Sequence, residues 1–162
     1  MCDEERLEHW IACYGDMLLR VCYLQLGDRT LAEDALQETF LRAWRHMGQF
    51  QRRHGAAERT WLTRIAINTC ATVRRSAWFR HVNRHVTPES LPLAAPPEDT
   101  ALLADLARLP DQLRRVIVLR YYQRLTLEET AQALGIGRST AWERERKALR
   151  LLRCDDEGRN AP

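Results

Sequence analysis

Apolar residues recur three and four positions apart along most of the chain, and this spacing predicts helices. In the first half such stripes fall in residues 7–26, 30–47 and 58–75. Their apolar positions are, in chain order, Ile11, Tyr14, Leu18, Val21 and Cys22; Leu36, Phe40, Ala43 and Met47; Trp61, Leu62, Ile65, Ala66 and Thr69. No segment shows the strict alternation of a strand. The predicted fold class is therefore all-α, with the first two helices antiparallel across a turn at Gly27 and Asp28.

Helix boundaries can be placed from capping residues. Thr30 with Glu33, and Thr126 with Glu129, have the spacing of a capping box, in which each side chain bonds the other residue's backbone N–H. Gly135 is expected to end the helix that Thr126 begins, and Ser139 or Thr140 to cap the last helix. A short helix, a turn with glycine and a second helix together predict a helix-turn-helix.

A proline-rich stretch divides the chain. Residues 82–100 contain four of the six prolines, namely Pro88, Pro92, Pro96 and Pro97. Proline lacks a backbone N–H, so we expect a flexible, extended linker there. The predicted architecture is a helical module over residues 1–81, this linker, a helix-turn-helix module over 101–153 and a disordered tail over 154–162.

Composition narrows the function classes. The net charge of +3 and the pI near 8.7 indicate a local basic surface. No run of about 18 apolar residues occurs and the N-terminus is acidic, so we expect neither membrane insertion nor a signal peptide, and a cytoplasmic protein. The five cysteines, scattered and without a CxxC pair, are interpreted as free thiols that mostly fill the core. A zinc site at Cys2, His9 and Cys13 is conceivable but not favoured, so no metal or cofactor is expected, nor any enzyme activity.

The last helix carries charges of both signs. From Leu134 to Arg153 six basic residues stand against Glu143 and Glu145. A solvated helix with charge pairs would explain the charges but not the preceding glycine turn. DNA reading is therefore favoured, with Glu143 able to accept a hydrogen bond from cytosine N4 and Glu145 pairing with a neighbouring arginine.

The first module carries two further surfaces. Asp34, Gln37, Glu38 and Leu41 share one face of their helix, which on pattern alone would be a solvated face. The aromatic and basic residues between Phe50 and Arg75 suit unpaired bases and a single-stranded backbone, although Trp61 fits the core at least as well.

Taken together, the chain resembles an extracytoplasmic-function (ECF) sigma factor of bacterial RNA polymerase, within the sigma-70 family. "AEDALQETFLRAW" resembles region 2.2, "TWLTRIAINTCATVRR" regions 2.3 to 2.4, and "LPDQLRRVIVLRYYQRLTLEETAQALGIGRST" region 4. The resemblance spans about residues 10–153. It implies a promoter-specificity subunit that binds core polymerase, recognises the −35 and −10 elements and promotes DNA melting.

The resemblance also implies roles for individual residues. Core polymerase, through its largest-subunit clamp helices, would meet Asp34, Gln37, Glu38 and Leu41. The −10 DNA would meet Phe50, Arg52, Arg53, Arg64, Asn68, Arg74 and Arg75. The −35 DNA would meet Arg138, Ser139, Thr140, Trp142, Glu143, Arg144 and Lys147. The other implied partners are the polymerase flap and an anti-sigma factor.

The chain departs from the family's sequence pattern at two places, and two alternative functions remain open. Thr72 stands where many members have aspartate, and "STAWER" replaces the commoner "GTVKSR", so no promoter sequence can be transferred. One alternative is a stand-alone helix-turn-helix regulator whose first module senses a ligand or dimerises. The other is a metal- or thiol-based sensor.

Overall fold

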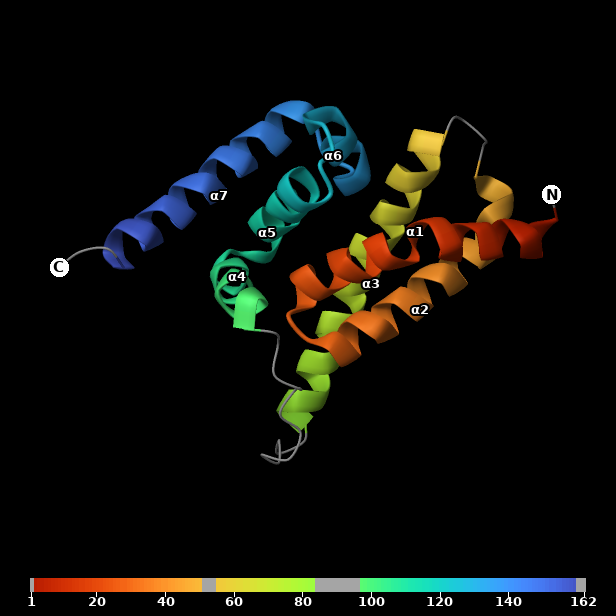
Figure 1. The fold of residues 1–162 in the computed structure, drawn as a ribbon, viewed down its shortest axis with the longest axis horizontal. Helices are drawn as coiled ribbons and strands as arrows, with labels where there is room; N and C mark the ends of the chain where they lie inside the picture. Colours follow the sequence, from red (N-terminus) through yellow and green to blue (C-terminus); the bar gives the residue numbers. More distant parts are fainter. Residues whose placement is uncertain (1, 51–54, 84–96, 160–162) are drawn as a thin grey trace. The chain divides into compact units, whose positions relative to one another are not determined.

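The computed structural model describes residues 2–50, 55–83 and 97–159, which form helices and contain no strand (Figure 1). The chain divides into two compact units, Met1–Ala94 and Ala95–Pro162, and each is described by itself. The all-α class and the two helical modules expected from the sequence are confirmed.

The first unit is a three-helix bundle. It comprises α1 (Asp3–Leu26), α2 (Arg29–Arg45), the short 3₁₀ turn η1 (Met47–Gln49) and α3 (Gly55–Asn83), and each α-helix packs against the other two. Phe40, Leu18 and Leu62 lie in the common core, as their spacing predicts. On α1, however, Trp10 is fully buried in the core, whereas Ile11 is 48% exposed, so the expected placement of Ile11 in the core stripe is wrong.

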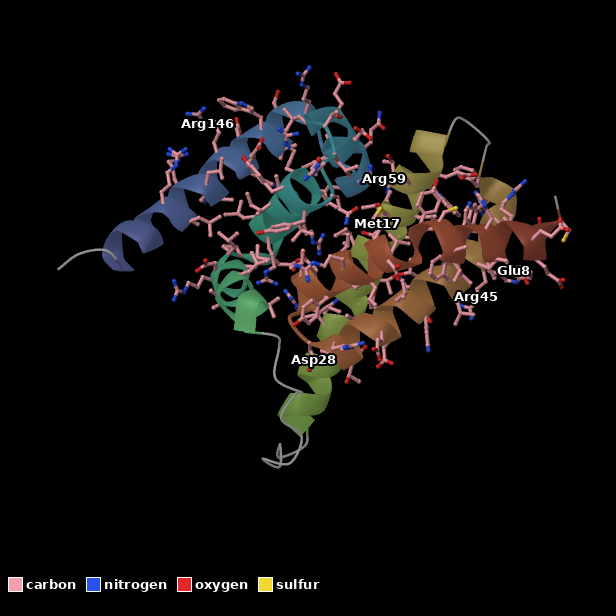
Figure 2. The ribbon with its side chains drawn as sticks, in the orientation of Figure 1. Glu8, Met17, Asp28, Arg45, Arg59 and Arg146 are labelled. Carbon is pink, nitrogen blue, oxygen red and sulfur yellow. The ribbon has the colours of Figure 1, made fainter. Side chains whose placement is uncertain are left out.

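Polar contacts add to the packing between α1 and α3. Nε of Arg59 donates to Sδ of Met17 at 3.2 Å, and Figure 2 shows these two side chains near each other. Burial raises the pKa of Tyr14, and the nearby Glu58 carboxylate raises it further. Both contacts join residues far apart in the sequence, which helical spacing alone cannot pair.

The start of α2 differs from the prediction. Asp28, in extended conformation, is the N-cap, and its Oδ1 accepts a hydrogen bond from the Leu31 backbone N–H at 2.9 Å. Thr30 therefore lies within the first turn, and the capping box expected from Thr30 and Glu33 is wrong. The cause is Gly27, whose φ of 73° ends α1 and leaves Asp28 as the first residue able to cap α2 (Figure 2).

The second unit contains the predicted helix-turn-helix. Its elements are α4 (Pro97–Arg108), α5 (Asp111–Ile117), the π-helical turn η3 (Val118–Tyr122), α6 (Leu127–Leu134) and α7 (Arg138–Arg159). Thr126 and Glu129 form the predicted capping box, with bonds of 3.1 and 3.0 Å. Gly135 ends α6 with a φ of 66°, also as predicted. The expected cap at Ser139 or Thr140 is wrong, because α7 already begins at Arg138, directly after Gly137.

The helices extend beyond the expected module boundaries. Helix α3 continues to Asn83 and α4 begins at Pro97, so both ends of the expected linker are helical, and residues 84–96 lie outside the described residues. Proline suits the first helical position because its missing N–H has no partner there in any case. Helix α7 runs to Arg159, which differs from the expected disordered tail, and no proline between Arg153 and Arg159 interrupts it.

Candidate functional surfaces

A partly buried ion pair fixes α7 within the second unit. Glu145 is only 8% exposed, and its Oε1 lies 3.2 Å from Nε of Arg120 on η3. Nη1 of Arg120 also donates to the Leu125 carbonyl at 2.8 Å. Burial raises the pKa of Tyr121, and the charge and hydrogen bond of Glu145 raise it further. Glu145 thus has the arginine partner expected for it, but that partner lies outside α7.

The opposite side of α7 is exposed and mostly basic. Seven residues of α7 were predicted to contact −35 DNA, and five of them are exposed: Arg138, Ser139, Trp142, Glu143 and Lys147. Thr140 and Arg144 are half-buried. Because α5 and α6 pack against the other side of α7, this face is the one presented to a ligand.

Arg146 belongs to this exposed face although it was not among the predicted contacts. Its guanidinium carbon lies 4.8 Å from the centre of the Trp142 ring. In Figure 2 Arg146 extends from the side of α7 that faces away from α5. The contact is a cation–π interaction between residues one helical turn apart.

An apolar groove runs between α1 and α2. Its volume is about 870 Å³, and Gln37, Phe40 and Leu41 of α2 face Leu7, Ile11 and Leu19 of α1 across it. Three large apolar side chains along it are exposed: Leu41 by 49%, Ile11 by 48% and Trp44 by 39%. Such exposed apolar residues gathered along one groove indicate a binding surface rather than chance exposure.

Acidic side chains border the groove on α1. Glu4, Glu8 and Asp16 contribute to its lining, and Glu8 is marked in Figure 2. On α2, Asp34 is exposed, and the half-buried Glu38 forms an ion pair with Arg42 at 3.1 Å. Gln37 and Leu41 of the groove were among the predicted polymerase contacts, whereas Trp44 of α2 and Ile11 and the acids of α1 were not. Ile11 lies within an apolar run, where spacing alone could not show that it faces outwards.

The arginine and asparagine residues predicted to meet −10 DNA fall into three groups. Arg64, Asn68 and Arg75 are exposed on α3, and separations of four and seven residues bring them to one side of that helix. Arg74 points elsewhere, since its guanidinium donates to the Gln25 carbonyl near the end of α1. Arg52 and Arg53 lie outside the described residues.

Phe50, also predicted to contact −10 DNA, packs against other aromatic side chains. It is half-buried, and the centre of its ring lies 4.9 Å from that of Trp61 and 5.9 Å from that of Trp10. These three rings form an aromatic cluster that joins the end of η1 to α1 and α3. An apolar side chain in a loop can either contact DNA or pack into the core. The packing of Trp10 against Phe50 could not be predicted from the sequence.

The thiols are divided between core and surface. Cys22 and Cys70 are buried, as expected of core residues, whereas Cys2 and Cys13 are exposed. Sγ of Cys2 accepts a hydrogen bond from the Glu5 backbone N–H at 3.5 Å, and Sγ of Cys13 lies 3.6 Å from Nδ1 of His9. Within the described ranges no three His, Cys, Asp or Glu side chains cluster closely enough to hold a metal ion, and no helix could cross a membrane.

Comparison with known proteins identifies both units. The family model "Sigma-70 region 2" matches residues 10–80, and "Sigma-70, region 4" matches residues 106–153. The ECF RNA polymerase sigma factor SigL of Mycobacterium tuberculosis is 36% identical over 150 residues, which cover 86% of this chain and 82% of SigL. For SigW of Bacillus subtilis the identity is 30%, over 93% of this chain and 89% of SigW.

Solved structures share the fold. One holds the sigma factor RpoE in complex with the anti-sigma factor NepR from Bartonella quintana, with a TM-score of 0.75, 19% identity, and coverage of 91% of this chain and 94% of that chain. Another holds CnrH in complex with the cytosolic domain of CnrY, with a TM-score of 0.71, 23% identity, and coverage of 96% and 90%.

Proposed function

Since the chain belongs to the ECF group of the sigma-70 family, it is a promoter-recognition subunit of bacterial RNA polymerase, and we propose how its surfaces divide that task. The observation that carries the proposal is the pairing of an apolar groove on the first unit with a basic exposed face of α7 on the second. Sigma factors are initiation factors, and we assign RNA synthesis itself to the core enzyme.

The groove between α1 and α2 is the proposed docking site for core polymerase. Leu41, Ile11 and Trp44 would lose their water contacts on binding, which favours association by about 25 cal/mol for each Å² of apolar surface buried. Asp34 and Glu38, on the same helix as the groove residue Leu41, would attract basic residues of the clamp helices in the largest subunit. In this way the acidic residues would orient the sigma factor on core polymerase, and the apolar residues would supply most of the binding free energy.

Melted −10 DNA is assigned to α3 and the segment before it. Arg64, Asn68 and Arg75 form the exposed surface, and Arg52 and Arg53 precede it in the chain. Extruding a base costs a few kcal/mol, so a surface that accepts a particular base turns this cost into specificity. We assign Phe50 and Arg74 supporting roles, because their side chains contact the bundle itself.

Duplex −35 DNA is assigned to the exposed face of α7. The arginines, the lysine and the hydroxyl groups would bond phosphates and fix the position of the helix in the major groove. Glu143 is exposed and could accept a hydrogen bond from cytosine N4, whereas the buried Glu145 could not. The second unit would also rest on the polymerase flap.

Regulation by an anti-sigma factor is also proposed. RpoE, which shares the fold, has been solved in complex with the anti-sigma factor NepR. An anti-sigma factor that covered the α1–α2 groove would prevent core polymerase from binding there. Competition for this groove between the two partners is therefore expected.

Retention on immobilised core polymerase tests the docking site. We expect the wild type to be retained, and Leu41→Glu and the double variant Asp34→Arg/Glu38→Arg each to lose about tenfold or more in affinity. Glu128→Arg/Glu143→Arg changes the net charge equally but lies on the second unit, and should be retained. Equal retention of all variants would remove the groove from the proposal.

The same experiment distinguishes a sigma factor from a stand-alone helix-turn-helix regulator. Such a protein would bind duplex DNA tightly without core polymerase and would ignore immobilised core. That pattern in the wild type would overturn the assignment of both units.

A further inference from the structure

Trp142 is the one large apolar side chain on an otherwise polar part of α7. It lies in the second turn, is 49% exposed, and has Arg138, Ser139, Glu145 and Arg146 at the positions three and four residues away. The next exposed apolar residue of the helix within the described part is Leu151, nine positions on. Along the described part of α7, Trp142 therefore has no second exposed apolar side chain within two helical turns, unlike a helix face that a protein partner would bury.

The Trp142 ring is held in place before any ligand binds. The Arg146 guanidinium lies 4.8 Å from the ring centre, one helical turn farther along. This contact restricts the ring, so less conformational freedom is lost when the ring meets a ligand. It also keeps a positive charge beside the ring, which favours a polyanion over a neutral or cationic partner.

The chemistry of the major groove indicates what such a ring could read. Early residues of a recognition helix reach base edges, and Trp142 lies at the fifth position of α7. Among the groups that the four base pairs present in the major groove, the C5-methyl of thymine is the apolar one. A flat apolar ring among cationic groups is complementary to a methyl group flanked by phosphates.

We infer that Trp142 is a specificity-determining residue that reads the C5-methyl group of a thymine in the −35 element, with Arg146 positioning its ring. This inference rests on the proposed binding of −35 DNA by α7 and adds the class of base that one residue selects. It predicts that the preferred −35 element contains a thymine whose contribution depends on its methyl group.

Replacing thymine by deoxyuridine isolates this group, because deoxyuridine pairs identically but lacks the methyl. Holoenzyme assembled from the full chain and core polymerase first selects preferred upstream sequences from a promoter library randomised in that region. The selected promoter is then synthesised with each thymine of the element replaced in turn. We expect one replacement to weaken wild-type binding about threefold to fivefold, the effect of burying one methyl group.

Variants assign the effect to the residue. In Trp142→Ala holoenzyme the thymine and deoxyuridine probes should bind equally, whereas the control Leu151→Ala, which removes another exposed apolar side chain of α7, should retain the wild-type difference. Circular dichroism would verify that both variants are folded. The inference is overturned if no replacement weakens the wild type, if the selected element lacks thymine, or if Trp142→Ala still discriminates.

The outcomes also separate this inference from the proposed function. Selection of a −35 element that is insensitive to deoxyuridine would disprove only the recognition of a thymine methyl group by Trp142. Failure of the wild-type holoenzyme to select any upstream sequence would sink both the role of Trp142 and the assignment of α7 to −35 DNA.

Discussion

At the residue scale, burial decides what a charged side chain can do. Glu143 and Glu145 lie two positions apart in α7, yet one is exposed and the other is 8% exposed and paired with Arg120. A buried carboxylate with a fixed partner contributes to structure, whereas an exposed one remains available to a ligand. Of the two glutamates in α7, Glu145 is thus held by its arginine partner, whereas Glu143 is available for the DNA contact that we propose.

Replacing these two glutamates separately should reveal the difference. Glu145→Gln weakens the ion pair and leaves Arg120 without a charged partner, and we expect it to lower the free energy of unfolding of the second unit by about 1–2 kcal/mol. Glu143→Gln should change it by less than about 0.5 kcal/mol. Urea unfolding followed by circular dichroism measures both, and equal effects would show that the Arg120–Glu145 pair contributes nothing.

Residue types and spacing predicted some single-residue contacts, whereas others could not be predicted for a physical reason. A helical wheel places Glu145 near the buried side of its helix, so an arginine partner could be predicted. Arg74 and Phe50, which the family resemblance assigns to DNA, also contact Gln25, Trp10 and Trp61, on other elements or across a turn. Contacts between distant segments depend on how the helices pack, which periodicity does not encode.

At the element scale, helix starts depend on which polar residue first follows a break in the chain. Asp28 caps α2 because Gly27 ends α1 immediately before it, whereas Thr30 is already the second residue of α2. Thr126 is the N-cap of α6 because it directly precedes the first residue of that helix. Both threonines have a glutamate at the correct spacing, so the capping-box pattern alone could not tell them apart.

This difference is measurable by substitution. Asp28→Ala removes the acceptor for the Leu31 N–H, and we expect it to lower the free energy of unfolding of the first unit by about 1 kcal/mol. Thr30→Ala, on the exposed first turn, should lower it by less than about 0.5 kcal/mol. Thermal unfolding would compare the two, and a larger loss for Thr30→Ala would contradict the assignment of Asp28 as the cap.

At the scale of the whole molecule, function depends on two units carried by one chain. Sigma-70 regions 2 and 4 match residues 10–80 and 106–153, and the stretch between them contains the predicted linker. Apolar periodicity was enough to predict two all-helical units. It could not predict the groove between α1 and α2, because a groove is a property of two packed surfaces.

Cutting the connection between the units should weaken promoter binding without changing either surface. A protease site inserted between Pro88 and Pro92 allows holoenzyme to be compared before and after cleavage. Linked sites gain from effective concentration, so we expect cleavage to lower promoter affinity by about 10²-fold or more. The uncleaved insertion variant is the control, and unchanged affinity after cleavage would show that the two units do not need a covalent link.

The exposed position of Trp142 has a practical consequence. The chain has five tryptophans, and Trp142 is the only one after residue 94. If the other four are replaced by phenylalanine, all tryptophan fluorescence of the chain comes from Trp142 in the second unit. Half-exposed and stacked against a cation, the indole would change its fluorescence when water or Arg146 is displaced. The residue that we propose reads DNA would then also serve as an intrinsic optical reporter of its own binding event.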